Sequence, residues 1–546
     1  MPPRVRTLLL CLVVPVSGGA AAGPAWVGSE VCRDCHSGIY RSYFATPMSR
    51  SAGSAAALPS GAKFDKAAFS DSRSGYSYRV AVEGGESFLY FRKNDGTIDA
   101  RRKLAYFVGS GASASSFLLS VDGFLYEAPV TYYSGAGEWR FSPGYDRYSY
   151  PFLTRAIAPG CLACHASRLQ PVEGTQNGYL DPPFLEGGVS CERCHGPGGV
   201  HADRMRAGDR AHGSGIVNPA RLDPERRDSV CNQCHLAGDI RVERAGASMA
   251  NFVAGDRLSD YAAVFVRAGE SGMRVTSHAE NLAQSGCKRV SGDRLWCGSC
   301  HDPHVRPGPA EKAAWFNGKC LNCHAASACT ESESVRRSNN DNCTACHMPK
   351  NPAGDADHVV YTNHSIQRRP GASRTAASQA VLLPFGRSAP GPRESGLAYA
   401  IVGLREGSSA YRTRAFGLLR EALRTNPEDP QALSYLADLY NGRGDADNAV
   451  RLYEKLWSID QTGASAPTVL GGRQMEQGNL EAAIALWRAA LRANPALVLV
   501  RANLAVALLR TGRPAEARKV LEKALEFNPA FQGARDLYAQ IPPPRP

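Results

Sequence analysis

Fourteen of the 17 cysteines in this 546-residue chain fall into seven copies of one pattern, Cys-x-x-Cys-His. Two thiols separated by two residues lie on one turn of backbone, where they can form thioether bonds to two vinyl groups of a porphyrin. The following His then projects toward the iron as proximal ligand. The pattern therefore predicts seven covalently bound haem c groups. The copies are Cys32/Cys35/His36, Cys161/Cys164/His165, Cys191/Cys194/His195, Cys231/Cys234/His235, Cys297/Cys300/His301, Cys320/Cys323/His324 and Cys343/Cys346/His347.

Structural zinc and disulfides also use paired cysteines. Zinc ribbons need motifs in pairs, whereas seven is odd and a His follows every second cysteine here. Disulfides within C-x-x-C are usually catalytic and reducible, and seven in one chain would be unusual. Cys287 and Cys329 lie outside the motifs. We predict a disulfide between them in an oxidising compartment, with two buried free thiols as the alternative.

Six of the 13 His lie outside the motifs, so at least one of seven haems lacks a second His ligand within a monomer. A bis-His haem is closed and suited to moving electrons, whereas an open haem can bind a substrate. Met48 is a possible substitute for the missing His. The candidate distal ligands are His201, His278, His304, His358 and His364, then His212 in a Gly-rich loop, and Met48.

Three of the motifs carry a family resemblance in the residues that follow them. Cys191 to Gly198, Cys297 to His304 and Cys343 to Lys350 resemble multihaem cytochromes related to tetrahaem cytochrome c and the hydroxylamine oxidoreductase type. More specifically, the chain resembles exported multihaem cytochromes fused to tetratricopeptide repeats, over about residues 26–370. The resemblance implies closely stacked haems in a largely helical domain, with distal His ligands from elsewhere in the chain. Some members carry electrons, and others act on small nitrogen or sulfur compounds at one open haem.

The N-terminus has the features of a secretory signal. Residues 1–22 contain Arg4 and Arg6, an apolar run at residues 8–16 and an Ala-Ala-Ala cleavage site. The run is too short to cross a bilayer, which needs about 20 residues. We therefore expect an exported protein, periplasmic or extracellular, without a transmembrane segment. Its formal charge of +12 falls to +10 without the signal, and we interpret the excess as counter-charge for haem propionates rather than for nucleic acid.

The stretch between the first two motifs predicts strands. Residues 76–82 alternate between apolar and polar side chains, Gly84 and Gly85 form a turn, and an apolar run resumes at residues 88–91. We expect a small antiparallel β insertion at about residues 63–150. From Cys161 to Lys350 the sequence is rich in Gly and Pro, with short helical patches such as residues 257–268. Haems would replace the missing apolar core there.

A 34-residue repeat begins after about Gly396. Gly444, Gly478 and Gly512 share this period, as do Leu436/Leu470/Leu504 and Ala449/Ala483/Ala517. The period and residue order are the tetratricopeptide signature. They predict three clear repeats, a degenerate one at about residues 395–426 and a C-terminal helix at residues 531–540.

The predicted fold class is mainly α: a multihaem cytochrome domain with a small antiparallel β insertion, followed by a tetratricopeptide α-solenoid. The expected organisation is a signal peptide at residues 1–22, a heptahaem cytochrome c domain at 23–370, a linker at 371–394 and repeats at 395–541. The first functional hypothesis is an electron carrier whose repeats dock redox partner proteins. The alternative is an oxidoreductase acting on a small nitrogen or sulfur compound at one open haem.

Overall fold

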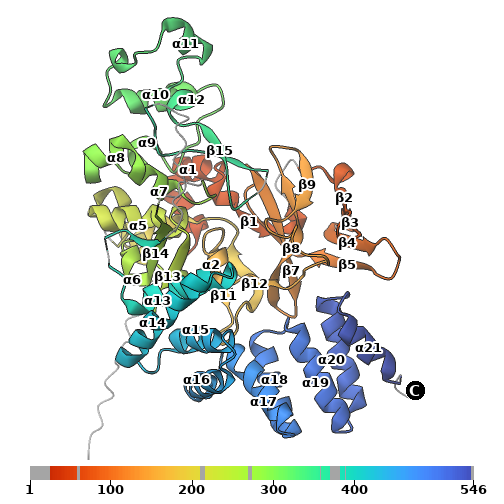
Figure 1. Ribbon diagram of the computed structural model, residues 1–546. Helices are drawn as coiled ribbons and strands as arrows, with labels where there is room; N and C mark the ends of the chain where they lie inside the picture. The colour runs from red at the N-terminus through yellow and green to blue at the C-terminus, as the bar shows by residue number, and fades with distance from the viewer. Residues whose placement is uncertain are drawn as a thin grey trace, which may run out of the picture.

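The computed structural model in Figure 1 describes residues 25–57, 62–209, 215–268, 273–356, 358–368, 381–387 and 389–542. The predicted signal peptide (residues 1–22), His212 and residues 371–380 of the predicted linker lie outside the described residues. Along the chain, two antiparallel sheets are followed by a region of short helices that carries six of the seven motifs, and then by a helical array.

Two antiparallel sheets follow the first helix, α1 (Ser29–Phe44). One has the strand order β2-β3-β4-β5, and the other has the order β1-β6-β7-β8-β10 with β9 paired to β8. The predicted hairpin is confirmed: Glu83 pairs with Glu86, and Gly84 and Gly85 form its two-residue turn with φ of 59° and 82°. The strands are β1 (Ala52–Ser54), β2 (Ala68–Asp71), β3 (Tyr76–Glu83), β4 (Glu86–Lys93), β5 (Asp99–Leu104), β6 (Tyr106–Val108), β7 (Ala114–Val121), β8 (Phe124–Tyr133), β9 (Glu138–Phe141) and β10 (Arg155–Ala156).

The expectation of a mainly α fold with one small β insertion is wrong. Helix makes up 46% and strand 18% of the structure, and three further antiparallel sheets lie among the motifs. Residues 257–268, predicted helical, form a short helix and then a strand, because the second half, Ala-Ala-Val-Phe-Val, is mostly buried and rich in β-formers. These sheets consist of β11 (Ser167–Pro171) with β12 (Tyr179–Glu186), β13 (Ile240–Glu243) with β14 (Ala262–Arg267) and β17 (Leu382–Phe385), and β15 (Lys350–Pro352) with β16 (Val360–Thr362).

The helices between the sheets are short, and most of them contain or adjoin a motif. Their length is set by the motif itself, because a Cys-x-x-Cys-His unit occupies little more than one helical turn. They are α2 (Pro159–Leu162), α3 (Cys191–His195), α4 (Gly199–Arg206), α5 (Pro224–His235), α6 (Leu258–Tyr261), α7 (His278–Gln284), α8 (Gly286–Ser291), α9 (Cys297–Cys300), α10 (Lys312–Leu321), α11 (Glu333–Ser338) and α12 (Cys343–His347).

The C-terminal part is an array of antiparallel helix pairs, as the 34-residue period predicts. Gly444, Gly478 and Gly512 follow the first helix of successive pairs with φ between 75° and 82°, a left-handed conformation that suits glycine. Ala449 and Ala483, at most 1% exposed, let the second helix approach the first. The helices are α13 (Pro392–Arg405), α14 (Ser409–Thr425), α15 (Pro430–Asn441), α16 (Ala446–Ile459), α17 (Ser465–Glu476), α18 (Leu480–Ala493), α19 (Val498–Arg510), α20 (Pro514–Phe527) and α21 (Gln532–Gln540).

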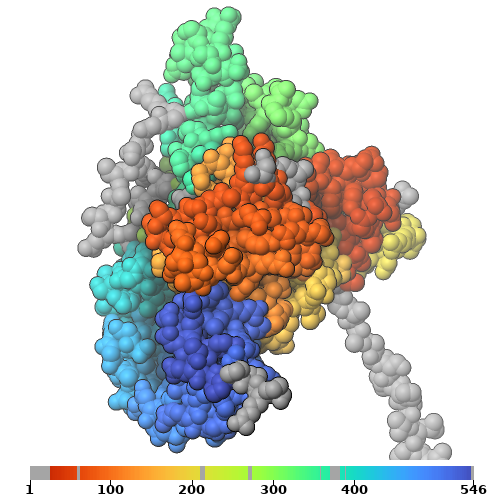
Figure 2. All heavy atoms as spheres, turned by 90° about the vertical axis from the view of Figure 1, so that its right-hand side faces the viewer, coloured from red at the N-terminus to blue at the C-terminus, as the bar shows by residue number. Residues whose placement is uncertain are grey.

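Both ends of this solenoid pack on the rest of the chain. At its start, α13 shares an apolar core with Phe265 of β14 and Leu382 of β17, so part of the predicted linker belongs to a sheet. Near its end, Phe527 lies in the core of the N-terminal sheets against the ring of Tyr126, with ring centres 5.4 Å apart. Figure 2 shows the blue C-terminal helices directly below the orange sheets. The solenoid is therefore braced against the sheets rather than joined only by its linker.

Residues 286–352, which carry the last three motifs, form a projection that we call the arm (Figure 1, helices α8 to α12). None of its 67 side chains is buried. Apolar packing within the polypeptide therefore does not account for its shape. In the described part of the chain, no helix combines the length and the apolar character needed to cross a bilayer.

Candidate functional site

All seven motifs open into one cavity of about 4360 Å³. Its wall includes every motif His and every motif cysteine except Cys161. Shared among seven motifs, this volume is about 620 Å³ each, within the roughly 300–1,000 Å³ of single ligand pockets. The cavity therefore has room for one large prosthetic group beside each motif. The arm contributes much of its wall, and without a bound group the arm has little to pack against.

Thiols of different motifs lie within hydrogen-bonding reach of each other. Cys32 contacts Cys191, and this bond lowers the pKa of Cys191 to about 7. In the same way Cys234 lowers the pKa of Cys164 to about 7. Two further contacts of this kind join Cys231 to Cys297 and Cys320 to Cys343. The attachment sites therefore lie close enough to shift each other's pKa, and groups bound at them would be close neighbours.

Three pairs of His rings face each other across the cavity. The ring centres of His36 and His201 are 6.4 Å apart at 13° between planes, and those of His195 and His304 are 6.0 Å apart at 15°. His301 and His364 are 6.2 Å apart at 34°. A metal bound by one nitrogen on each side at roughly 2.0–2.1 Å separates two imidazole centres by about 6 Å. The three pairs therefore fit axial ligation of a haem iron.

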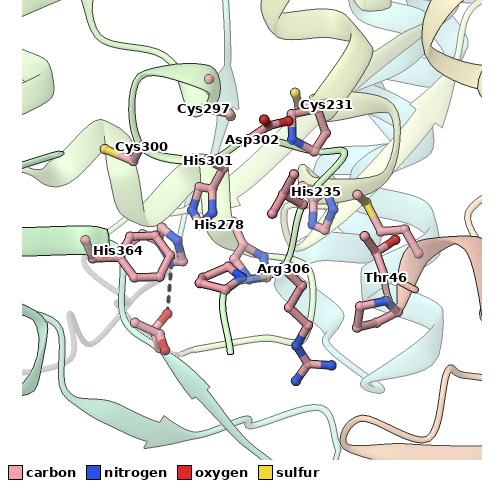
Figure 3. Close-up of a pocket in the computed structure, with 18 of the residues that line it drawn as sticks. Thr46, Cys231, His235, His278, Cys297, Cys300, His301, Asp302, Arg306 and His364 are labelled. Atoms are coloured by element: carbon pink, nitrogen blue, oxygen red, sulfur yellow. Dashed lines mark hydrogen bonds between the residues drawn. The ribbon is translucent and has the colours of Figure 1, made fainter. Parts of the chain in front are cut away.

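A fourth pair, His235 and His278, is closer and nearly perpendicular, with ring centres 5.0 Å apart at 85°. Figure 3 shows His235, His278, His301 and His364 gathered from different elements into one part of the cavity, with Thr46 at its edge. Each paired ring comes from a motif and from a segment outside that motif. Folding, rather than local sequence, brings the two members together.

Ring nitrogens of three of these His are held by backbone carbonyls. His195 Nδ1 is 2.8 Å from the oxygen of Val217, and His347 Nδ1 is 2.9 Å from that of Gln367. His364 Nδ1 is 2.9 Å from its neighbouring carbonyl at Thr362. Such a bond fixes the ring orientation and leaves Nε2 for a metal. The arrangement is that of metal-binding imidazoles.

Desolvation by the surrounding protein holds several of the site's His in the neutral form that binds metals, although their rings are open to the cavity and none is buried. Desolvation lowers the pKa of His278 to about 3 and that of His301 to about 4. The same cause lowers the pKa of His165, His235 and His364. At neutral pH these rings are therefore uncharged and available as ligands.

The remaining candidate residues are placed less centrally. His358 is exposed, packs on the ring of Tyr133 at 5.1 Å and is not part of the cavity wall. Met48 lies in the wall, and His212 lies outside the described residues. Among the described residues, three motif His have no ring contact with another His: His165, His324 and His347.

The predicted disulfide is not formed in the structure. Cys287 and Cys329 are both free thiols, as are the other 14 cysteines of the described chain. Both lie in the cavity wall, but Cys329 is exposed, in a part of the arm without a core. In the described residues, no three His, Cys, Asp or Glu side chains are clustered to hold a metal ion by themselves.

Charged residues that sequence reasoning did not single out also support the site. The cavity wall contains eight basic and seven acidic side chains, so the basic excess of the chain is not concentrated there. Arg193 donates to the carbonyl of Ala163, and Arg241 donates to that of Gln233, at the ends of two motif helices. A cation at a helix C-terminus is stabilising. No sequence signal distinguishes these arginines from solvated ones.

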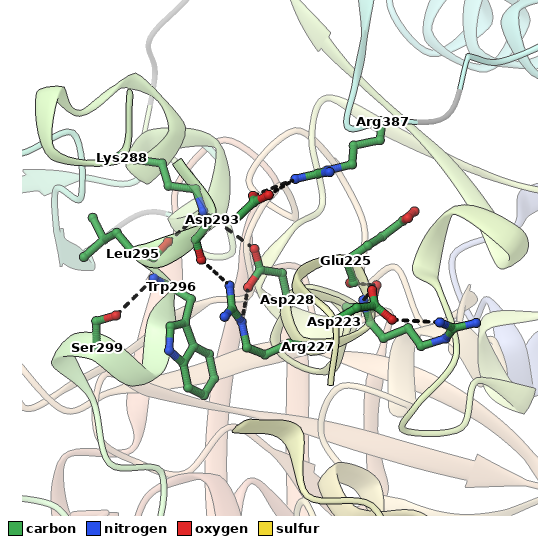
Figure 4. Close-up of polar contacts among 12 residues, drawn as sticks. Asp223, Glu225, Arg227, Asp228, Lys288, Asp293, Leu295, Trp296, Ser299 and Arg387 are labelled. Carbon is green, nitrogen blue, oxygen red and sulfur yellow. Dashed lines mark hydrogen bonds and ion pairs between the residues drawn. The ribbon is translucent and has the colours of Figure 1, made fainter. Parts of the chain in front are cut away.

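A set of ion pairs at the base of the arm, which we call the clasp, joins it to α5 and to the segment after β17 (Figure 4). Arg387 binds both carboxylate oxygens of Asp293 at 2.6 Å, and Arg227 donates to the Asp293 carbonyl at 2.7 Å. Lys288 lies 3.7 Å from Asp228. Arg387 lowers the pKa of Asp293 below its ordinary value. The clasp is one polar attachment of an arm that lacks buried side chains; the pairing of β15 with β16 is another.

Comparison with known proteins relates the two parts of the chain to different families. Residues 150–196, which hold the second and third motifs, match the family described as cytochrome c554 and c-prime. Residues 412–464 and 474–541 each match a tetratricopeptide repeat family. The chain therefore joins a c-type cytochrome segment, which binds haem c covalently, to tetratricopeptide repeats.

Two relatives match parts of the chain. The multiheme cytochrome MtrA of Shewanella baltica (strain OS185) is 26% identical over 214 residues, or 38% of this chain and 57% of that protein. Cellulose synthase operon protein C of Pseudomonas fluorescens (strain SBW25) is 29% identical over 181 residues, or 32% of this chain and 14% of that protein. The chain thus spans little more than half of one relative and a seventh of the other. A solved structure of MamA from AMB-1 shares 25% identity over 27% of the chain, with a TM-score of 0.24.

Proposed function

We propose that the protein is an exported heptahaem c-type cytochrome that carries electrons along a chain of haems, in the periplasm or outside the cell. The observation that carries this proposal is the single cavity into which all seven motifs open, with motif His rings facing a second His at metal-binding spacing. Bound haem supplies one-electron chemistry there. We assign it to the tetrahaem cytochrome c and hydroxylamine oxidoreductase-like group. Residues 23–370 form the cytochrome domain and residues 395–541 the repeats.

We assign the distal ligands from the facing rings. His201 is assigned to the first motif, His304 to the third and His364 to the fifth, because each lies opposite the motif His at metal-binding spacing. His278 is assigned to the fourth motif as the neighbour of His235, with ring centres 5.0 Å apart. Met48, His358 and His212 remain candidates for the other three motifs.

From the proximity of the attachment cysteines we propose the order in which the haems pass electrons to one another. The first motif touches the third, the second touches the fourth, the fourth touches the fifth, and the sixth touches the seventh. Cys194 lies near Cys231, and Cys300 lies near Cys323, which joins the third motif to the fourth and the fifth to the sixth. The route therefore runs 1-3-4-5-6-7, with the second motif as a side branch from the fourth.

The haem count and the route are tested together by removing one attachment site at a time. Mass spectrometry of the intact protein should show seven haems, and six in a variant with Cys231→Ser and Cys234→Ser. Cys287→Ser is the matched control and should keep seven. In stopped-flow reduction, loss of the fourth motif should stop electron transfer between motifs 1 and 3 on one side and motifs 5, 6 and 7 on the other. Loss of the second motif should leave the rate of transfer along the route unchanged. A mature protein without covalent haem contradicts the proposal.

We propose that the repeats dock redox partner proteins, since tetratricopeptide arrays present extended binding surfaces. Because α13 and Phe527 pack on the rest of the chain, the docking role cannot be tested by deleting the repeats. Truncation after residue 396 would expose both cores, so partner binding should be measured with the full chain carrying substitutions on exposed solenoid residues. A partner that binds such variants with unchanged affinity contradicts the docking role.

The second candidate function is an oxidoreductase acting on a small nitrogen or sulfur compound at one open haem. The observation that favours it is that His165, His324 and His347 face no other His among the described residues. The second motif is the one we test, because a partly buried ion pair, Glu127 with Arg155 at 2.9 Å, lies near its Cys161. Carbon monoxide binding by the reduced protein, lost in a variant with Cys161→Ser and Cys164→Ser, would support it. A reduced protein that binds no carbon monoxide contradicts it.

A further inference from the structure

A buried carboxylate lies inside the third motif, between its two cysteines. Glu192 is 1% exposed and accepts three backbone hydrogen bonds. Its Oε1 accepts from the N–H of Val27 at 3.0 Å and of Gly198 at 2.8 Å, and its Oε2 accepts from the N–H of Gly28 at 2.8 Å. Without it, two donors in buried residues, Gly28 and Gly198, and one in the half-buried Val27 would lose their partner, which is costly for backbone groups.

These donors stand at the starts of two different helices. Gly28 is the N-cap of α1, which carries His36, and Gly198 is the N-cap of α4, which carries His201. One carboxylate of the third motif therefore ties together the two helices that supply the facing rings of the first motif's pair. The carboxylate also lies at the positive ends of both helices, where a negative charge is favourable.

Glycines allow the two helix starts to come this close. Gly199 donates to the carbonyl of Ala25 at 3.0 Å. A Cβ on Gly199 would lie 2.8 Å from the Ala25 Cβ and 2.9 Å from its oxygen, closer than side chains approach. The Gly198-Gly199 pair and Glu192 thus belong to one arrangement, which fixes the spacing of α1 and α4.

We propose that Glu192 is the positioning residue for the His36–His201 pair, holding the two rings in their near-parallel arrangement. The inference rests on the proposed function, since it assigns that pair to the first haem. Glu192 touches neither ring and acts through the starts of α1 and α4. A Gln in its place keeps the size but has one accepting oxygen, and its amide N–H groups face the backbone donors.

A second buried carboxylate makes a similar link at the fourth motif. Glu280, 8% exposed, lies on α7 two residues after His278 and accepts from the N–H of Gly238 at 2.6 Å. Gly238 follows the fourth motif by three residues, so this bond ties the helix of His278 to the turn beyond His235. The link at Glu192 therefore has a counterpart at the fourth motif.

The test compares Glu192→Gln with Glu186→Gln in the full-length holoprotein. Glu186 accepts from the N–H of Ser29 at 2.8 Å, so it contacts the same start of α1 but not α4. We expect Glu192→Gln to keep the wild-type haem mass while one iron in seven changes from low spin to high spin in the absorption and EPR spectra. Added imidazole should restore the low-spin signal, because it replaces the displaced His201. Glu186→Gln should match the wild type.

Equal spectra and potentials in Glu192→Gln and wild type would overturn the proposal, and so would the same change in both variants. If Glu192→Gln is recovered without its haems, Glu192→Asp decides: its shorter carboxylate cannot reach all three donors, so a partial high-spin signal is expected and an unchanged spectrum overturns the proposal. A wild-type protein without haem would refute the proposed function instead. The two failures are therefore distinguishable.

Discussion

The arm (residues 286–352) and the solenoid (residues 392–541) are both built from helices, but different interactions hold them. The solenoid contains continuous apolar cores in which Trp487, Leu504 and Leu508 are at most 2% exposed. The arm has no buried side chain at all, although it carries three motifs. Burial of apolar area stabilises a fold by roughly 25 cal/mol per Å², so the solenoid is stable as polypeptide. We expect the groups bound at its three motifs to supply the apolar core that the arm lacks.

This contrast explains why one chain can carry both regions. If the arm's three motifs carry the proposed haems, folding of the arm should be coupled to their attachment, as in small metal-dependent domains. Folding of the solenoid depends on residues that recur with a 34-residue period. Changes to the attachment sites and changes to the apolar core should therefore have separable effects.

The largest expected effect follows from removing a haem from the arm. With Cys320→Ser and Cys323→Ser the sixth motif cannot attach its haem, so the arm loses the apolar surface that it would pack against. One buried side chain contributes about 1.5–3 kcal/mol, and a haem is several times larger, so we expect its loss to cost more than about 5 kcal/mol. The open state of the arm, and with it the rate of limited proteolysis there, should rise by roughly a thousandfold or more. Cys329→Ser, which removes an exposed thiol of the arm outside the motifs, is the control. Equal cleavage rates in all three proteins would show that the arm stands without its cofactor.

A smaller effect is expected from a cavity in the solenoid. Trp487 is 1% exposed and donates from its indole to the carbonyl of Thr468 at 3.2 Å. Trp487→Ala should lower the free energy of unfolding by about 3–5 kcal/mol, measured by urea denaturation of the solenoid signal, with haem content unchanged. Leu499→Ala, at a side chain 62% exposed, should change it by less than about 0.5 kcal/mol. A fall in haem content with Trp487→Ala would mean that the two regions fold as one unit.

The smallest effect concerns the clasp at the base of the arm. Arg387→Ala removes an exposed pair with Asp293 and should cost about 0.2–1 kcal/mol, measured as faster proteolysis of the arm at low salt and little change at high salt. Because Arg387 lowers the pKa of Asp293, the pair contributes fully above the ordinary value of about 4 and is lost as pH falls through the lower folded-state value.

Arg387→Lys is the matched control, since it keeps the charge on a shorter side chain with an ammonium in place of the guanidinium. It should show an intermediate proteolysis rate with the same pH dependence. A rate in Arg387→Ala that does not depend on salt or pH would show that the clasp does not hold the arm.

The predicted fold was right where local pattern decides it and wrong where packing does. The hairpin at Gly84-Gly85 and the repeats at Gly444, Gly478 and Gly512 have the predicted geometry, because turns and helix ends are encoded by neighbouring residues. The three sheets that lie among the motifs (β11-β12, β13-β14-β17 and β15-β16) were not predicted. Strand β17 pairs with β14 across more than 100 residues, and no local pattern announces such a partner.

The candidate site shows the same division. The seven motifs can be found in the sequence because each consists of only five consecutive residues. The distal His ligands cannot, because folding decides which His lies opposite each motif. His201 faces a ring 165 residues earlier in the chain, and His304 faces one 109 residues earlier. His358, an equally reasonable candidate by proximity in sequence, is exposed on Tyr133.

The sequence by itself determined which atoms can be bonded to haem and how often the repeat recurs. Thioether attachment and helix pairing depend on spacings of a few residues that backbone geometry alone preserves. The tertiary structure alone decided which imidazoles face each other, which carboxylate holds two helix starts together and which region lacks a core. Those properties depend on contacts between distant segments, whose entropic cost of approach is met only by the packing of the whole chain.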